Sequence, residues 1–78
     1  NFKMVNIPKG AELLFINDEN IKIKVIDNRS VEFNGEATSL SKAAQEALGV
    51  NWPAQGPIYW MYNGETLDDR RRRMENEE

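Results

Sequence analysis

Apolar and polar residues alternate along the first half of the chain in short segments typical of β-strands. Residues 21–25 read Ile-Lys-Ile-Lys-Val, so the apolar side chains should share one face and the two lysines the other. We expect further strands at 11–16, 30–33 and 36–38. Polar turns are expected between them, at residues 17–20 and 27–29.

Two Asn-Gly pairs, at 34–35 and 63–64, predict tight chain reversals. Both central residues of a type I′ turn take positive φ, and Asn followed by Gly adopts that conformation at the least cost. The first pair should join two strands, and the second should lead toward a C-terminal helix.

The spacing of apolar residues changes to a helical period after Ser39, which can cap a helix over 39–49. One stripe of this helix contains Leu40, Ala43, Ala44, Ala47 and Leu48. Gly49 can end the helix in the left-handed conformation. A second helix is predicted from Thr66, because Asp68 and Asp69 in its first turn suit the helix dipole.

Residues 58–62 form a strongly aromatic segment that we expect to be a strand. Alternation would place Ile58, Trp60 and Tyr62 on one face, with Tyr59 and Met61 on the other. Both faces are apolar, which is typical of a central or covered strand. The predicted fold class is α+β: an antiparallel β-meander of three or four strands, a central helix, a further aromatic strand and a C-terminal helix.

The composition limits the classes of function. The 78 residues suffice for one domain over 1–78, and they contain neither Cys nor His. A disulfide framework and a cysteine zinc site are therefore excluded, as is a histidine general base. No apolar stretch could span a membrane and no export signal is visible, so we expect a cytoplasmic protein. Because the chain begins at Asn1 and not at Met, we expect a piece cut from a longer protein.

Catalytic chemistry finds little support in the residues present. Ser39 and Lys42 match the Ser-x-x-Lys string of serine acyl-transfer enzymes, but a capped helix start explains them more simply. Asp68 and Asp69 are adjacent on a helix and diverge by about 100°, so they cannot share a metal ion or a proton. We expect no enzyme activity, no metal and no cofactor.

Four consecutive arginines, at residues 70–73, are the densest basic feature of a chain whose net charge is −3. On a helix they spread over roughly 300°, so they cannot form a single basic stripe. Acidic neighbours can neutralise them through the pairs Asp68–Arg72, Asp69–Arg73 and Arg71–Glu75. Two interpretations stay open: a solvated, self-paired helix, or a contact with nucleic acid or an acidic partner.

The loop at 50–57 contains an aromatic residue, Trp52, and a hydrogen-bonding residue, Gln55. In a domain this small, a tryptophan is most simply part of the core. The same loop could also stack on a base or anchor a partner peptide. Both interpretations of Trp52 stay open at the level of the sequence.

A series of short motifs resembles a known family. The motifs are Ile7-Pro8-x-Gly10-Ala11-x-Leu13, Val31-Glu32-Phe33-Asn34-Gly35, Ser39-Leu40-Ser41-x-Ala43-Ala44, Leu48-Gly49, Gly56-Pro57-x-Tyr59-Trp60 and Gly64-Glu65-Thr66-Leu67-Asp68-Asp69-Arg70-Arg71. Their order resembles a bacterial family of small C-terminal domains of unknown function that is related to RAMA (restriction enzyme adenine methylase associated) domains. That family often accompanies GIY-YIG-type nucleases, at the C-terminal end of longer proteins. The resemblance therefore implies that this chain was cut from the C-terminal part of such a protein. The resemblance implies a non-catalytic accessory module that reads or positions DNA.

Two functions follow as expectations. The first is a DNA-facing module of a nuclease or restriction-type protein, whose basic residues should converge on one surface near Trp52. The second is a protein-interaction or oligomerisation module, with an exposed apolar patch around Trp52, Tyr59 and Met61. The partner would be DNA or a neighbouring domain of a longer chain, and no membrane. The candidate contact residues are Lys22, Lys24, Arg29, Lys42, Trp52, Gln55, Arg70, Arg71, Arg72 and Arg73.

Overall fold

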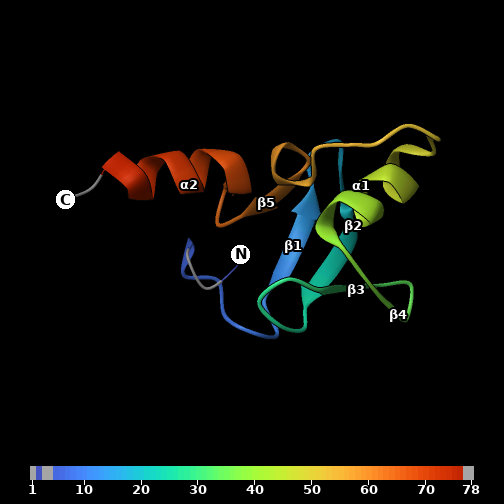
Figure 1. Cartoon of the computed structure of the whole chain (residues 1–78), viewed down its shortest axis with the longest axis horizontal. Coiled ribbons are helices and arrows are strands. Elements are labelled where there is room, and N and C mark those ends of the chain that lie inside the picture. Colours follow the sequence, from blue (N-terminus) through green and yellow to red (C-terminus); the bar gives the residue numbers. More distant parts are fainter. Residues whose placement is uncertain (1, 3–4, 77–78) are drawn as a thin grey trace.

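A computed structural model describes residue 2 and residues 5–76. These residues form the strands β1 (Glu12–Phe15), β2 (Asp18–Val25), β3 (Val31–Phe33), β4 (Glu36–Thr38), β5 (Trp60–Tyr62) and β6 (Glu65–Thr66). They also form the helices α1 (Leu40–Leu48) and α2 (Leu67–Asn76) and a 3₁₀ turn, η2 (Gly56–Ile58). The strands make one antiparallel sheet in the order β4-β3-β2-β1-β5-β6. Figure 1 shows β1 and β2 near the middle of the molecule. The predicted α+β fold, with its meander and C-terminal helix, is confirmed.

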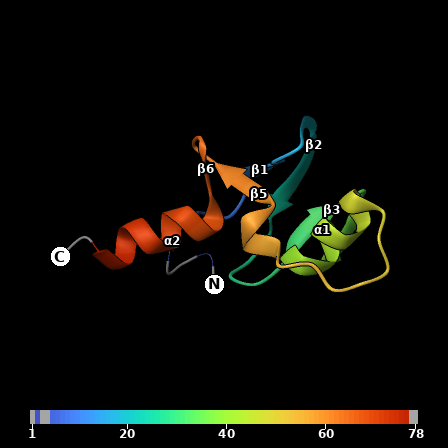
Figure 2. The same cartoon turned by 90° about the horizontal axis from the view of Figure 1, so that it is seen from above.

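One face of the sheet is covered and the other is open. Leu13 pairs with Ile23, and Phe15 pairs with Trp60, and all four side chains are buried on the covered face. Figure 2 shows α1 and α2 on the same side of the sheet. Because side chains alternate along a strand, the residues between these positions point to the open face.

The core lies between the sheet and α1. Ala43 and Ala44 are fully buried, so the small side chains of the predicted stripe bring the helix close to the strands. Leu67 at the start of α2 is also buried, and Met74 packs against the same core. Neither α1 nor α2 is long and apolar enough to cross a membrane.

The predicted caps and reversals are confirmed. Asn34 and Asn63 have φ angles of 53° and 54°, and the glycine after each is also at positive φ. The Ser39 hydroxyl accepts a hydrogen bond from the Lys42 amide at 3.1 Å. Gly49 ends α1 with φ 71° and ψ 34°, as a left-handed residue.

Two predicted segments differ from the structure by more than one residue. Residues 17–20 are not a four-residue turn, because β2 already begins at Asp18 and pairs with Phe15 across an irregular step in the register. The aromatic strand is shorter than residues 58–62, because Pro57 favours the 3₁₀ turn that ends at Ile58. Ile58 therefore does not share the face of Trp60; it is 40% exposed.

Candidate functional site

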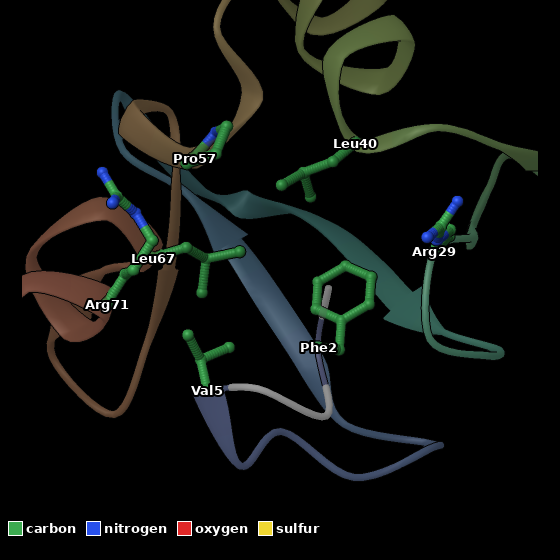
Figure 3. A pocket seen from close by; sticks show the side chains of 7 residues that line it. All are labelled: Phe2, Val5, Arg29, Leu40, Pro57, Leu67 and Arg71. Carbon is green, nitrogen blue, oxygen red and sulfur yellow. The ribbon is translucent and has the colours of Figure 1, made fainter. Parts of the chain in front are cut away.

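A groove lies where the N-terminal segment (residue 2 and residues 5–11), α1, η2 and α2 meet (Figure 3). Its volume is about 490 Å³, and its lining residues are Phe2, Val5, Arg29, Leu40, Pro57, Leu67 and Arg71. In Figure 3 the side chains of Phe2, Val5, Leu40 and Leu67 point toward one another, and the two arginines stand on opposite sides of them. The groove therefore combines an apolar centre with a basic rim.

The wall formed by α1 and η2 depends on a close backbone contact. Leu40 is the first residue of α1, directly after its cap, and its side chain faces the groove. A Cβ atom added to Gly56 would lie 2.9 Å from the backbone of Leu40 and Ser41. The Ser41 hydroxyl also accepts a hydrogen bond from the Gly56 amide at 3.3 Å. Only glycine lets η2 approach α1 this closely, which places Pro57 at the groove.

The opposite wall is the N-terminal segment, which Arg70 fastens to α2. The Arg70 Nε donates to the carbonyl of Val5 at 2.7 Å, and its guanidinium lies 5.0 Å from the ring centre of Tyr62. A salt bridge of 3.5 Å joins it to Glu65. The Arg70 side chain is only 12% exposed, so this predicted contact residue is a structural clamp.

The rim arginines differ in their own partners. Arg71 donates to Asp68 at 2.9 Å and to Glu75 at 3.2 Å, and the hydrogen bond that it donates to Asp68 is the main reason that the pKa of Arg71 is raised above its usual value. Arg29 forms no ion pair with any residue that the structure describes. Asp27 fixes the loop that contains Arg29. The Asp27 carboxylate accepts a hydrogen bond from the Arg29 amide, and this hydrogen bond lowers the pKa of Asp27 below its ordinary value.

The remaining arginines of the run at 70–73 are paired on the surface. Arg72 forms a salt bridge with Asp68 at 3.0 Å, which confirms one predicted pair, and the Arg71–Glu75 pair is confirmed as well. Arg73 binds Glu65 at 2.9 Å, where we expected a pair with Asp69. The run is a self-paired helix and not a basic stripe.

The basic residues do not converge on one surface. Lys22 and Lys24 lie on the open face of the sheet, and Lys24 sits between Glu12 and Glu32 on the neighbouring strands. Lys42 is exposed on α1, which covers the other face. Of the candidate residues, Arg29 and Arg71 are the two that line the groove.

The two tryptophans have different environments. Trp60 is fully buried, and its indole N–H donates to the Leu40 carbonyl at 3.2 Å. Trp52 is 65% exposed in the loop after α1, so the interpretation of Trp52 as a core residue is wrong. Gln55 is exposed in the same loop, and Tyr59 is half-buried against the Phe15 ring. Neither Trp52 nor Gln55 lines the groove.

Sequence reasoning missed most of the groove. Phe2, Val5, Leu40, Pro57 and Leu67 line it, and none of them was a candidate contact residue. Their segments are far apart in the chain, so no local pattern marks them as neighbours. Gly56 was the one usable signal, because glycine lacks a Cβ atom and permits a close approach of two backbones.

The described residues contain no group of three or more His, Cys, Asp or Glu side chains that could hold a metal ion. No protein-family model, curated protein or solved structure matches the chain. The groove is therefore interpreted from its own geometry and chemistry.

Proposed function

We propose that this domain is a non-catalytic binding module, and that its groove holds a segment of a partner protein. The observation that carries the proposal is the lining of the groove: five apolar residues and two arginines, with no carboxylate and no nucleophile among the described residues that form it. Concave apolar sites with a few polar groups are the usual places where proteins bind ligands, at volumes of about 300–1,000 Å³.

The proposal places the domain in the cytoplasm as an accessory part of a longer chain. Its resemblance to the RAMA-related family supports this arrangement, since such domains often accompany GIY-YIG-type nucleases. The partner segment would then belong to a neighbouring domain or to a companion subunit.

Selection from a random peptide-display library against the immobilised chain tests the proposal. We expect enrichment of related peptides by the unaltered chain and loss of that enrichment in Leu40→Gln, because Leu40 supplies apolar surface to the groove. Leu48→Gln is the matched control: Leu48 is also a half-buried leucine of α1, but it lies at the other end of the helix and outside the groove. Circular dichroism melting checks that both variants fold.

Enrichment that survives Leu40→Gln would contradict the proposal. So would an equal loss of enrichment in both leucine variants at equal folded fraction, because the groove would then have no special role. Failure to enrich any peptide would contradict it as well.

DNA binding is the second candidate, and one observation favours it. Lys22 and Lys24 are both exposed on the open face of the sheet, where a backbone phosphate could reach them. The adjacent Glu12 and Glu32 reduce the local positive charge. Titration of fluorescein-labelled duplex DNA at about 50 mM salt, where phosphate contacts are strongest, tests this candidate; Lys22→Gln with Lys24→Gln should abolish any true signal.

A further inference from the structure

Two arginines line the groove of a protein that is acidic overall. The chain carries a net charge of −3, yet the only charged residues that line the groove in the described structure are Arg29 and Arg71. They stand on opposite sides of the apolar centre, one from the loop between β2 and β3 and one from α2 (Figure 3). A ligand that fills this groove therefore meets a cation on each side of its apolar part.

We propose that the partner segment is an acidic peptide: one apolar side chain enters the groove, and carboxylates before and after it pair with Arg29 and Arg71. This inference rests on the proposed function and names the chemistry of its ligand. Arginine suits the role, because its planar guanidinium binds a carboxylate through two parallel hydrogen bonds.

Two features of the free domain favour such a contact at Arg29: a fixed backbone and, among the described residues, an unpaired guanidinium. The Asp27 carboxylate accepts the amides of Arg29 and Ser30 at 2.9 and 2.8 Å, which fixes the backbone of the turn. The guanidinium itself has no ion-pair partner among the residues that the structure describes. The backbone of Arg29 is fixed, and no carboxylate of the described residues neutralises its guanidinium.

Arg71 differs from Arg29, because it has two carboxylate partners and would exchange only one of them for the ligand. Asp68 is only 17% exposed and holds one side of the guanidinium at 2.9 Å, so it positions Arg71. Glu75 is 62% exposed and contacts the other side at 3.2 Å. Exposed pairs of this i,i+4 type contribute little stability, so a ligand carboxylate can replace Glu75. In the free domain Glu75 occupies the position that the ligand would take.

Fluorescence anisotropy with three labelled peptides tests the inference on the full chain of 78 residues. The probes are the acidic pentapeptide Glu-Glu-Leu-Glu-Glu, its basic counterpart Lys-Lys-Leu-Lys-Lys, and Glu-Glu-Ser-Glu-Glu, which lacks the apolar centre. We expect the first to bind at least about tenfold more tightly than the other two, because only it matches both the rim and the centre of the groove.

Variants of the arginines locate the contact. Arg29→Gln and Arg71→Gln should each weaken binding of the acidic peptide about fivefold, while Arg72→Gln, the matched control on the neighbouring position of α2, should leave it within twofold. Glu75→Gln should strengthen binding about twofold, because it removes the internal competitor for Arg71. Thermal melting of each variant confirms that these exposed changes leave the domain folded.

The outcomes separate this inference from the proposed function. If the display experiment enriches neutral or basic peptides that still require Leu40, the binding module stands and its acidic preference is overturned. Binding of the acidic peptide that is unchanged by both Arg29→Gln and Arg71→Gln also overturns the inference. Tight binding of duplex DNA that is lost in these two variants would overturn it too, by assigning the rim to phosphate.

Discussion

Arg70 shows how one residue of a basic run can serve the fold. Its Nε is bound to the Val5 carbonyl, and its side chain lies between the N-terminal segment, β6 and the Tyr62 ring. We predict that Arg70→Ala lowers the free energy of unfolding by about 2 kcal/mol, because a hydrogen bond from a charged donor is lost in a half-buried place. Chemical denaturation followed by circular dichroism measures the change.

Arg72→Ala is the control for this prediction. Arg72 has a salt bridge to Asp68 but is exposed, so the expected loss is below about 0.5 kcal/mol. Equal losses in the two variants would mean that Arg70 acts as an ordinary surface charge.

Gly56 is the second residue whose side chain, here a single hydrogen atom, is required by its contacts with α1. Alanine at this position would put a Cβ atom 2.9 Å from the backbone of Leu40 and Ser41, which cannot move without shifting α1. We predict that Gly56→Ala destabilises the domain by about 1–3 kcal/mol, the range typical of overpacking. Thermal and denaturant unfolding measure this.

A comparison with Gly35→Ala separates crowding from backbone conformation. Gly35 has a φ of 81° and open space around its Cβ position, so its substitution strains the backbone without creating a contact. Peptide binding to the groove should persist in Gly35→Ala and weaken in Gly56→Ala. Unimpaired binding and stability in Gly56→Ala would disprove the close contact.

At the scale of elements, β6 and α2 are joined by the charge cluster around Glu65. The hydrogen bonds that Arg73 donates lower the pKa of Glu65 below its ordinary value of 4.5. A carboxyl whose pKa is lower in the folded than in the unfolded chain stabilises the fold above its ordinary pKa, and this stabilisation is lost as the pH falls through the folded pKa.

We therefore predict a melting temperature that changes little between about pH 5 and 8, since the chain has no His, and that falls below pH 4.5. Glu65→Gln should be less stable than the unaltered chain at pH 7 and should lose less stability on acidification. Melting curves recorded from pH 3 to pH 8 measure both. Parallel pH profiles of the two proteins would show that Glu65 does not contribute.

The elements themselves were largely predictable from the sequence. Local backbone preferences determine the caps at Ser39 and Gly49 and the two Asn-Gly reversals. They do not depend on contacts with distant parts of the chain. Residues 18–20 were mistaken for a turn because a polar strand end has no apolar alternation to reveal it. Pairing with β1, a contact between segments, is what makes them a strand.

At the scale of the whole molecule, the groove could not be predicted, because it belongs to no single element. Phe2, Leu40 and Leu67 meet only after the sheet has placed the N-terminal segment beside both helices. The same packing separated the candidate cations, since strand alternation turned Lys22 and Lys24 to the open face. The sequence identifies the basic side chains, but the topology of the sheet decides which of them lie on the same surface.

The hydrogen bond from the Trp60 indole to the Leu40 carbonyl gives the molecule an internal reporter. The Leu40 side chain lines the groove, and the Leu40 carbonyl accepts the hydrogen bond from the fully buried Trp60 indole. A ligand that displaces Leu40 would therefore change the environment of the indole N–H proton. The solvent-facing indole of Trp52, outside the groove, supplies a reference signal within the same spectrum. Occupancy can thus be followed by nuclear magnetic resonance without attaching any dye.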